Sequence, residues 1–207
     1  DVELFKLVIA SGVAEGGPPR LLGSPHAYVR LSTPLPQFFE RAIRTGFRTI
    51  EARGGQLLLN GEPIYLTGFN RHEDSPQRAM ASDLETARQD LLDMKAAGAN
   101  FVRLGHYPQD PSVYRAADRL GLILWDELPW CRGGLGDEEW KRNTESMLRE
   151  MIAQNRNHPS VFFWSLGNES GYGPNHDAMA GFIRGYDPDR IVHYEGAISH
   201  GPQNWKR

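Results

Sequence analysis

The sequence has little of what would place it outside the ordinary globular proteins. Its 207 residues hold one cysteine, Cys131, which excludes an internal disulfide and leaves the redox compartment undefined. No apolar run reaches the length that a membrane span needs. The net charge of −3 argues against strong attraction to nucleic acid or anionic membranes. We therefore expect a soluble protein with no nucleic acid and no membrane among its partners, and the cytoplasm and the periplasm both stay open.

From residue 52 onward, short apolar runs alternate with segments of helical period. The runs predict five strands, at residues 64–69, 100–104, 122–125, 161–166 and 191–194. In the helical segments, Ser82 and Glu85 match a capping box, Gly121 fits a left-handed helix end, and Pro174 fits a first helical turn. Right-handed βα units need this order of elements. The predicted fold class is α/β, with the first five βα units of a (β/α)8 TIM barrel in residues 52–207.

A polar dipeptide, Asn168-Glu169, follows the most apolar of the predicted strands. Parallel α/β proteins carry their chemistry at the carboxyl ends of their strands, where a glutamate can act as a general acid or base. The alternative is purely structural. Asn168 or Ser170 would cap the next helix, and Glu169 would favour its positive end.

Several motifs of this sequence occur in the same order as in one known family of proteins. They are Asn60-Gly61-Glu62-Pro63, Gly68-Phe69-Asn70-Arg71-His72-Glu73, Val102-Arg103-Leu104-Gly105-His106-Tyr107-Pro108, Trp125-Asp126-Glu127, Asn157-His158-Pro159-Ser160-Val161, Trp164-Ser165-Leu166-Gly167-Asn168-Glu169-Ser170-Gly171, Asp187-Pro188-Asp189-Arg190 and His193-Tyr194-Glu195-Gly196. Together, over residues 46–196, they resemble glycoside hydrolase family two, whose members include β-galactosidases, β-glucuronidases and β-mannosidases. Among these enzymes, the motifs are most similar to those of the β-galactosidases.

The resemblance implies a division of the chain into two parts. Residues 1–51, with strand-like stretches at 4–10, 27–32 and 47–51, would be the C-terminal part of an immunoglobulin-like β-sandwich domain. Residues 52–207 would be the first part of a TIM-barrel catalytic domain. We therefore expect the chain to be a fragment of the full enzyme.

The same resemblance assigns roles to particular residues. Glu169 matches the acid/base of the family, Asn168 the residue that binds the sugar 2-hydroxyl, and His72 and His106 the sugar-binding histidines. Retaining hydrolysis needs a second carboxylate as nucleophile. In the family this is a glutamate on a later strand, and the only later glutamate here, Glu195, matches a different motif. The nucleophile is thus expected outside this chain.

Three further sets of residues allow two interpretations each. Arg103, near the end of the second strand, would belong to the substrate-binding site and keep a nearby nucleophilic carboxylate ionised, or it would pair with an acidic neighbour inside the barrel. Asp126 and Glu127 end the third strand, where they would face the site or form an ion pair with a barrel arginine. Among the tryptophans, Trp130, Trp140 and Trp205 could line a sugar cleft, although packing is favoured for Trp140.

The resemblance also bears on metal binding. Family members with a site magnesium carry a glutamate and a histidine where this chain has Cys131 and Gly133. Neither residue offers the hard oxygen side chain that Mg²⁺ prefers, so we expect no metal site and no cofactor.

The expected function is hydrolysis of terminal β-D-galactosides by a retaining mechanism. The alternatives are a β-glucuronidase or β-mannosidase of the same family, and a non-catalytic sugar-binding remnant. The expected partners are a β-linked galactoside or related glycoside and the remainder of the polypeptide. Monomer and homo-oligomer both stay open.

Overall fold

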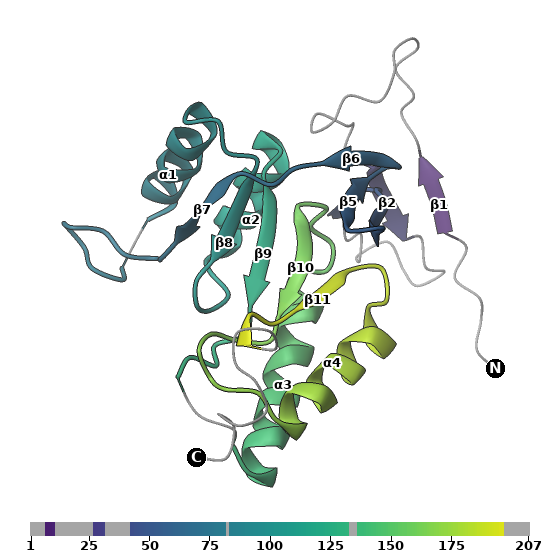
Figure 1. Cartoon of the computed structure of the whole chain (residues 1–207). Coiled ribbons are helices and arrows are strands. Elements are labelled where there is room, and N and C mark those ends of the chain that lie inside the picture. Colours follow the sequence, from purple (N-terminus) through teal and green to yellow (C-terminus); the bar gives the residue numbers. More distant parts are fainter. Residues whose placement is uncertain (1–6, 11–26, 32–41, 82, 133–135, 197–207) are drawn as a thin grey trace, which may run out of the picture.

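The computed structural model describes residues 7–10, 27–31, 42–81, 83–132 and 136–196. Its main sheet contains β7 (Gly68–Arg71), β8 (Phe101–Leu104), β9 (Ile123–Glu127), β10 (Val161–Ser165) and β11 (Ile191–His193). Helices α1 (Leu84–Ala96), α2 (Pro111–Leu120), α3 (Glu138–Asn155) and α4 (Pro174–Tyr186) connect successive strands. All neighbouring strands are parallel and follow sequence order, β11-β10-β9-β8-β7 (Figure 1). The predicted fold class, a partial TIM barrel with parallel strands in sequence order, is confirmed.

Two small antiparallel sheets precede this parallel sheet. The first contains β1 (Leu7–Ala10), β2 (Ala27–Leu31) and β3 (Ala42–Thr45), and the second β4 (Ile50–Arg53), β5 (Gln56–Leu59) and β6 (Glu62–Ile64). The predicted strand at residues 47–51 is thus displaced to β4. The predicted domain boundary after residue 51 falls inside β4, which pairs with β5. The β-sandwich origin of residues 1–51 stays a prediction.

The two faces of the parallel sheet pack against different layers. Val102, Leu124 and Trp164 contribute to the larger hydrophobic core, which they share with buried residues of all four helices. Ile123 and Phe163 point the other way and join a smaller core with Leu59 of β5. Because side chains alternate along a strand, each strand supplies both cores. The second face is the barrel interior, and the β4–β6 sheet covers part of it.

Helix ends follow local hydrogen bonding, and one of them differs from its prediction. Asp83, not Ser82, is the N-cap of α1, and its carboxylate accepts from the Thr86 N–H at 2.8 Å. Gly121 ends α2 with φ 72°, as predicted. Gly173 is the N-cap of α4, with Pro174 in the first turn. The alternative that Asn168 or Ser170 caps this helix is therefore wrong.

The first predicted strand, at residues 64–69, is also wrong as a single element. β6 ends at Ile64 and β7 begins at Gly68, so the apolar run crosses from one sheet to the next. No helix within the described ranges is both long and apolar enough to cross a bilayer.

Candidate active site

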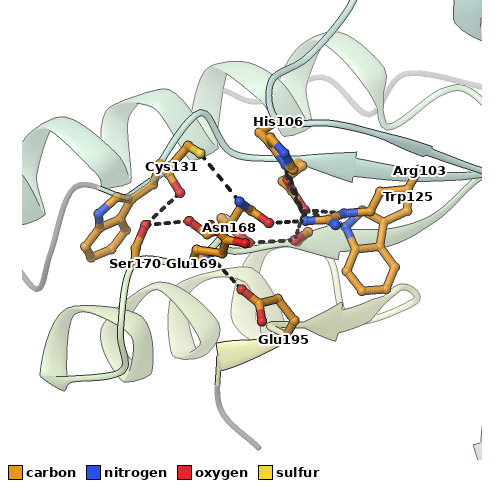
Figure 2. A network of polar contacts seen from close by, with 12 residues as sticks. Arg103, His106, Trp125, Cys131, Asn168, Glu169, Ser170 and Glu195 are labelled. Carbon is orange, nitrogen blue, oxygen red and sulfur yellow. Dashed lines mark hydrogen bonds and ion pairs between the residues drawn. The ribbon is translucent and has the colours of Figure 1, made fainter. Parts of the chain in front are cut away.

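A polar network joins the carboxyl ends of neighbouring strands. Arg103 lies on β8, Glu127 ends β9, and Asn168 and Glu169 follow β10 (Figure 2). Because parallel strands end at the same edge of a sheet, residues up to 66 positions apart in sequence come together. The predicted site residues Arg103, His106, Asn168 and Glu169 thus share one region of the molecule.

Glu127 is at the centre of this network and is fully buried. Its Oε2 accepts from Arg103 Nε at 3.0 Å, Trp125 Nε1 at 2.9 Å and Ser165 Oγ at 2.8 Å. Its Oε1 accepts from Arg103 Nη2 at 3.0 Å and lies 2.7 Å from His106 Nδ1. Both carboxylate oxygens are thus occupied as hydrogen-bond acceptors within the protein. The ion-pair interpretation therefore holds for Glu127 and Arg103.

Asp126 points to the opposite face of β9. It is fully buried and accepts from the Tyr114 hydroxyl and from Asn155 Nδ2, both at 2.8 Å. Burial raises its pKa to about 6. Strand alternation explains why two adjacent carboxylates have separate surroundings: Glu127 faces the barrel interior and Asp126 faces the helices.

Arg103 also fixes the amide of Asn168. Its Nη2 donates to Asn168 Oδ1 at 2.8 Å, while Asn168 Nδ2 donates to the Cys131 sulfur at 3.5 Å. The amide oxygen is thus occupied, and the amide nitrogen remains the group able to donate to a ligand. Asn168 is 6% exposed, so it forms the floor of the site.

The two predicted histidines lie side by side. The rings of His72 and His106 are 5.2 Å apart, edge to face. Because a carboxylate only accepts hydrogen bonds, the contact with Glu127 makes His106 Nδ1 the donor. His72 is exposed and follows β7. The structure brings both histidines to the same edge as Asn168.

Glu169 presents the most accessible carboxylate of the network, with 54% of its side chain exposed. Its Oε2 accepts from Arg132 Nε at 2.7 Å, and its backbone N–H donates to Glu195 Oε1 at 2.6 Å. The backbone of Glu169 has φ 48°, in the left-handed region that non-glycine residues seldom adopt. Neither Arg132 nor Glu195 was predicted to contact Glu169. The only signal for Arg132 was its place in the loop after the Asp-Glu strand.

An aromatic stack supports the loops that carry these residues. The buried His176 ring lies between Trp130, at 4.2 Å, and Tyr194, at 4.4 Å, and both contacts are stacked. Ser170 Oγ donates to the Trp130 carbonyl at 2.9 Å. Trp130 is completely buried, so its predicted place in a sugar cleft is wrong. Trp140 packs against the core, as favoured, and Trp205 lies outside the described residues.

Burial lowers the pKa of two histidines near the network. The pKa of His176 falls to about 4 because its ring is desolvated in the stack. His193 lies over Trp125 with 4.2 Å between ring centroids, and its pKa is lowered by burial and by the charge of Arg103. Both rings are therefore neutral at neutral pH and serve as packing groups.

The two positions expected to bear metal ligands are Cys131 and Gly133. Cys131 is exposed beside Asn168, and Gly133 lies outside the described residues. Within the described ranges, no group of three or more His, Cys, Asp or Glu side chains is arranged to hold a metal ion.

The sequence and the structure are both similar to those of known proteins. Residues 50–204 match the model of the glycosyl hydrolases family 2 TIM barrel domain. A protein of Formosa agariphila named "Putative beta-glucuronidase" is 51% identical over 149 residues, 72% of this chain and 17% of the relative. A β-galactosidase of Pectobacterium atrosepticum is 43% identical over 183 residues, 83% of this chain and 18% of the relative.

Among solved structures, the β-glucuronidase of Parabacteroides merdae superposes with a TM-score of 0.73 at 34% identity, covering 82% of this chain and 23% of that one. The chain thus spans about a fifth of the length of these three relatives. The match covers most of the chain and all five βα strands of the described sheet. The chain belongs to glycosyl hydrolase family 2, and its residues 50–204 are part of the TIM barrel domain of that family.

Proposed function

We propose that this chain supplies the acid/base half of a retaining β-glycosidase site, working within a longer polypeptide. Glu169 is the proposed general acid and base. The observation that carries the proposal is the accessible Glu169 carboxylate, next to an Arg103–Glu127–Asn168 network at the carboxyl end of the barrel strands. Family membership and the relatives' names support β-glycoside hydrolysis as the reaction.

The proposed reaction uses two carboxylates in two steps. A nucleophile from outside this chain attacks the anomeric carbon while Glu169 gives its proton to the leaving oxygen, which departs as an alcohol. Glu169, now a carboxylate, then takes a proton from water as the water oxygen displaces the nucleophile. The sugar leaves with its original configuration, and Glu169 regains its proton.

The surrounding residues would bind the sugar. Asn168 Nδ2 is the proposed donor to the sugar 2-hydroxyl, a contact that strengthens toward the transition state. Arg103 holds Asn168 and Glu127 in place and contributes positive charge for the incoming nucleophilic carboxylate. His106 and His72 are proposed to accept or donate hydrogen bonds to other hydroxyl groups.

For the sugar we propose β-D-galactoside first, as the sequence motifs favour, and β-glucuronide second. The second candidate is supported by two relatives, from Formosa agariphila and Parabacteroides merdae, whose names contain β-glucuronidase. Parallel measurement of kcat/KM on nitrophenyl β-galactoside, β-glucuronide and β-mannoside decides between them. The first candidate requires the highest value for the galactoside.

The acid/base role is tested by Glu169→Ala in the active polypeptide. A glycoside with a poor leaving group should lose activity far more than a nitrophenyl glycoside, because only the former needs protonation. Added azide should restore turnover of the nitrophenyl glycoside and yield the β-glycosyl azide. Equal losses on both substrates without an azide product would contradict the assignment, and no hydrolysis by the unaltered protein would favour a sugar-binding remnant.

A further inference from the structure

Glu169 is contacted by two charged side chains from the loops on either side of its own. Arg132, after β9, donates from Nε to Glu169 Oε2 at 2.7 Å. Glu195, after β11, accepts the Glu169 backbone N–H at 2.6 Å, and Figure 2 shows its carboxylate directed at that backbone. One contact thus holds the main chain of Glu169 and the other holds its carboxylate.

The backbone around these contacts is in rare conformations. Glu169 has φ 48° and Arg132 has φ 57°, both in the left-handed region. Such conformations in non-glycine residues cost free energy, persist only where the surroundings enforce them, and gather at functional sites. Here the enforcement is visible, since the Arg132 N–H donates to the Asn168 carbonyl at 3.0 Å and the Asn168 N–H donates to the Trp130 carbonyl at 2.8 Å. The two loops form a short parallel bridge.

The loop of Glu195 is also held by hydrogen bonds. The neighbouring Tyr194 hydroxyl donates to the Gly171 carbonyl at 2.5 Å and accepts the Ser170 N–H at 3.0 Å. The loop that carries Glu195 is therefore hydrogen-bonded to the loop that carries Glu169.

The Arg132–Glu169 pair is too exposed to serve mainly as a stabilising contact. Their side chains are 75% and 54% exposed, and ion pairs between such solvent-exposed groups add little to stability. Arg132 stays charged, because its hydrogen bond to Glu169 raises its pKa further. Since Nε engages one carboxylate oxygen, the second oxygen remains available to a ligand.

We propose that Arg132 and Glu195 are positioning residues for the acid/base, a role that rests on the proposed function of Glu169. Glu195 fixes the backbone N–H of Glu169, and Arg132 fixes the carboxylate so that its other oxygen faces the leaving group. Proton transfer needs this alignment, and misplacement of a catalytic group by about 1 Å costs up to about 100-fold in rate.

The test is carried out on the longer, active polypeptide that contains this chain. It compares two substrates: methyl β-galactoside, which has a poor leaving group, and dinitrophenyl β-galactoside, which has a good one. If the glucuronide proves to be the substrate, the corresponding glucuronides are used. Arg132→Gln should lower kcat/KM for the methyl glycoside by about 10- to 100-fold and leave that for the dinitrophenyl glycoside within about threefold. Arg132→Lys keeps the charge without the fork and should recover part of the loss.

Glu195 offers a matched pair of variants. Glu195→Gln retains a carbonyl oxygen that can accept the Glu169 N–H and should remain within about threefold of the unaltered protein. Glu195→Ala removes that acceptor and should show the same leaving-group-selective loss as Arg132→Gln. Arg88→Gln, which breaks an exposed ion pair with Glu85 on α1, is the control and should change neither rate.

The two proposals fail in different ways. A selective loss in Glu169→Ala with unchanged rates in Arg132→Gln and Glu195→Ala overturns the positioning role and leaves the acid/base assignment intact. Equal losses on both substrates in the two positioning variants also overturn it, because a merely structural defect lowers the fraction of active protein for every substrate. If Glu169→Ala itself shows no selectivity, the proposed function is wrong.

Discussion

At the scale of single residues, the surroundings of a side chain decide its role more than its chemical type. Asp126 and Glu127 are adjacent carboxylates, yet one accepts from Tyr114 and Asn155 among the helices and the other from Arg103 inside the barrel. Glu169 shares their carboxyl group but is the accessible one. Accessibility, which lets a carboxylate reach a leaving oxygen, separates the proposed catalytic group from the two structural ones.

The buried His176 predicts a pH dependence of stability. Its folded pKa of about 4 lies below the ordinary value of 6.5, so the unfolded chain binds a proton first as the pH falls. The resulting stabilisation is complete above pH 6.5 and is lost as the pH falls toward 4, by up to about 3 kcal/mol. His176→Phe, which keeps a ring between Trp130 and Tyr194, should flatten this part of the profile.

The measurement is denaturant unfolding of both proteins between pH 4 and 7. Asp126 acts in the opposite direction in this range, because its raised pKa adds stability as the pH falls through about 6. The difference between the two proteins isolates the histidine, since Asp126 is present in both. Parallel stability profiles would show that His176 does not stay neutral in the stack.

At the scale of elements, the loop between β10 and α4 depends on one glycine. Gly167 has φ 130°, and a Cβ there would lie 2.5 Å from the Trp130 carbonyl oxygen. Gly167→Ala should therefore destabilise the fold by about 1–3 kcal/mol and displace Asn168 and Glu169. Activity should fall more than the stability loss explains.

Thermal unfolding and kcat/KM measured together check this expectation. Gly181→Ala, inside α4 with no atom beyond its own stretch of helix backbone within 4 Å of the new Cβ, is the matched control. It should raise stability by about 0.5–1 kcal/mol, because alanine is the better helix former, and leave activity unchanged. A Gly167→Ala variant that behaves like this control would contradict the argument.

Hydrophobic periodicity predicted the buried strands well. It predicted the ends of strands and helices less well, because local hydrogen bonds determine where an element begins and ends. The apolar runs became β8 to β11 because both faces of these strands are covered. The run at residues 64–69 misled, since apolarity alone does not show where β6 ends and β7 begins. Asp83 displaced Ser82 as the cap of α1 because either side chain suits that position.

Site geometry was harder to predict than the elements. The strand ends brought Arg103, Asn168 and Glu169 together as expected, since parallel topology alone requires it. The contacts of Glu169 with Arg132 and Glu195 depend on left-handed backbone and on loop-to-loop bonds, which no periodicity encodes. Motif letters were also ambiguous. His158 bonds Asp118 at 2.6 Å and Arg190 bonds Asp187 at 2.6 Å, and both contacts connect elements outside the proposed site.

At the scale of the whole molecule, the parallel sheet has two edges. In the described sheet β7 and β11 are the outer strands, and Phe69 on β7 is 48% exposed. Strand edges and exposed apolar side chains favour association. The proposed site has the same open character, because double displacement needs a second carboxylate that we expect from elsewhere.

We therefore expect residues 1–207 alone to associate in solution and to hydrolyse no nitrophenyl β-glycoside at a meaningful rate. Light scattering and a direct assay measure both properties, and adding a separately made C-terminal portion with a second glutamate should restore hydrolysis. Hydrolysis by the monomeric chain alone, abolished by Glu169→Gln, would contradict this expectation. The nucleophile would then be sought among the carboxylates next to Glu169, beginning with Glu195.

The pairing of β9 has a consequence for how the protein reaches its native state. Trp125 is aligned with Arg103 on β8, and Glu127 with Ser165 on β10. A slip of β9 by one residue would turn Asp126 into the barrel interior and Glu127 toward the helices, since strand side chains alternate. Arg103, which holds Asn168, would then face a shorter carboxylate. In a complete enzyme that contains this chain, only molecules that pair β9 in the observed register would become active, so the specific activity after refolding would measure the fraction with correct strand pairing.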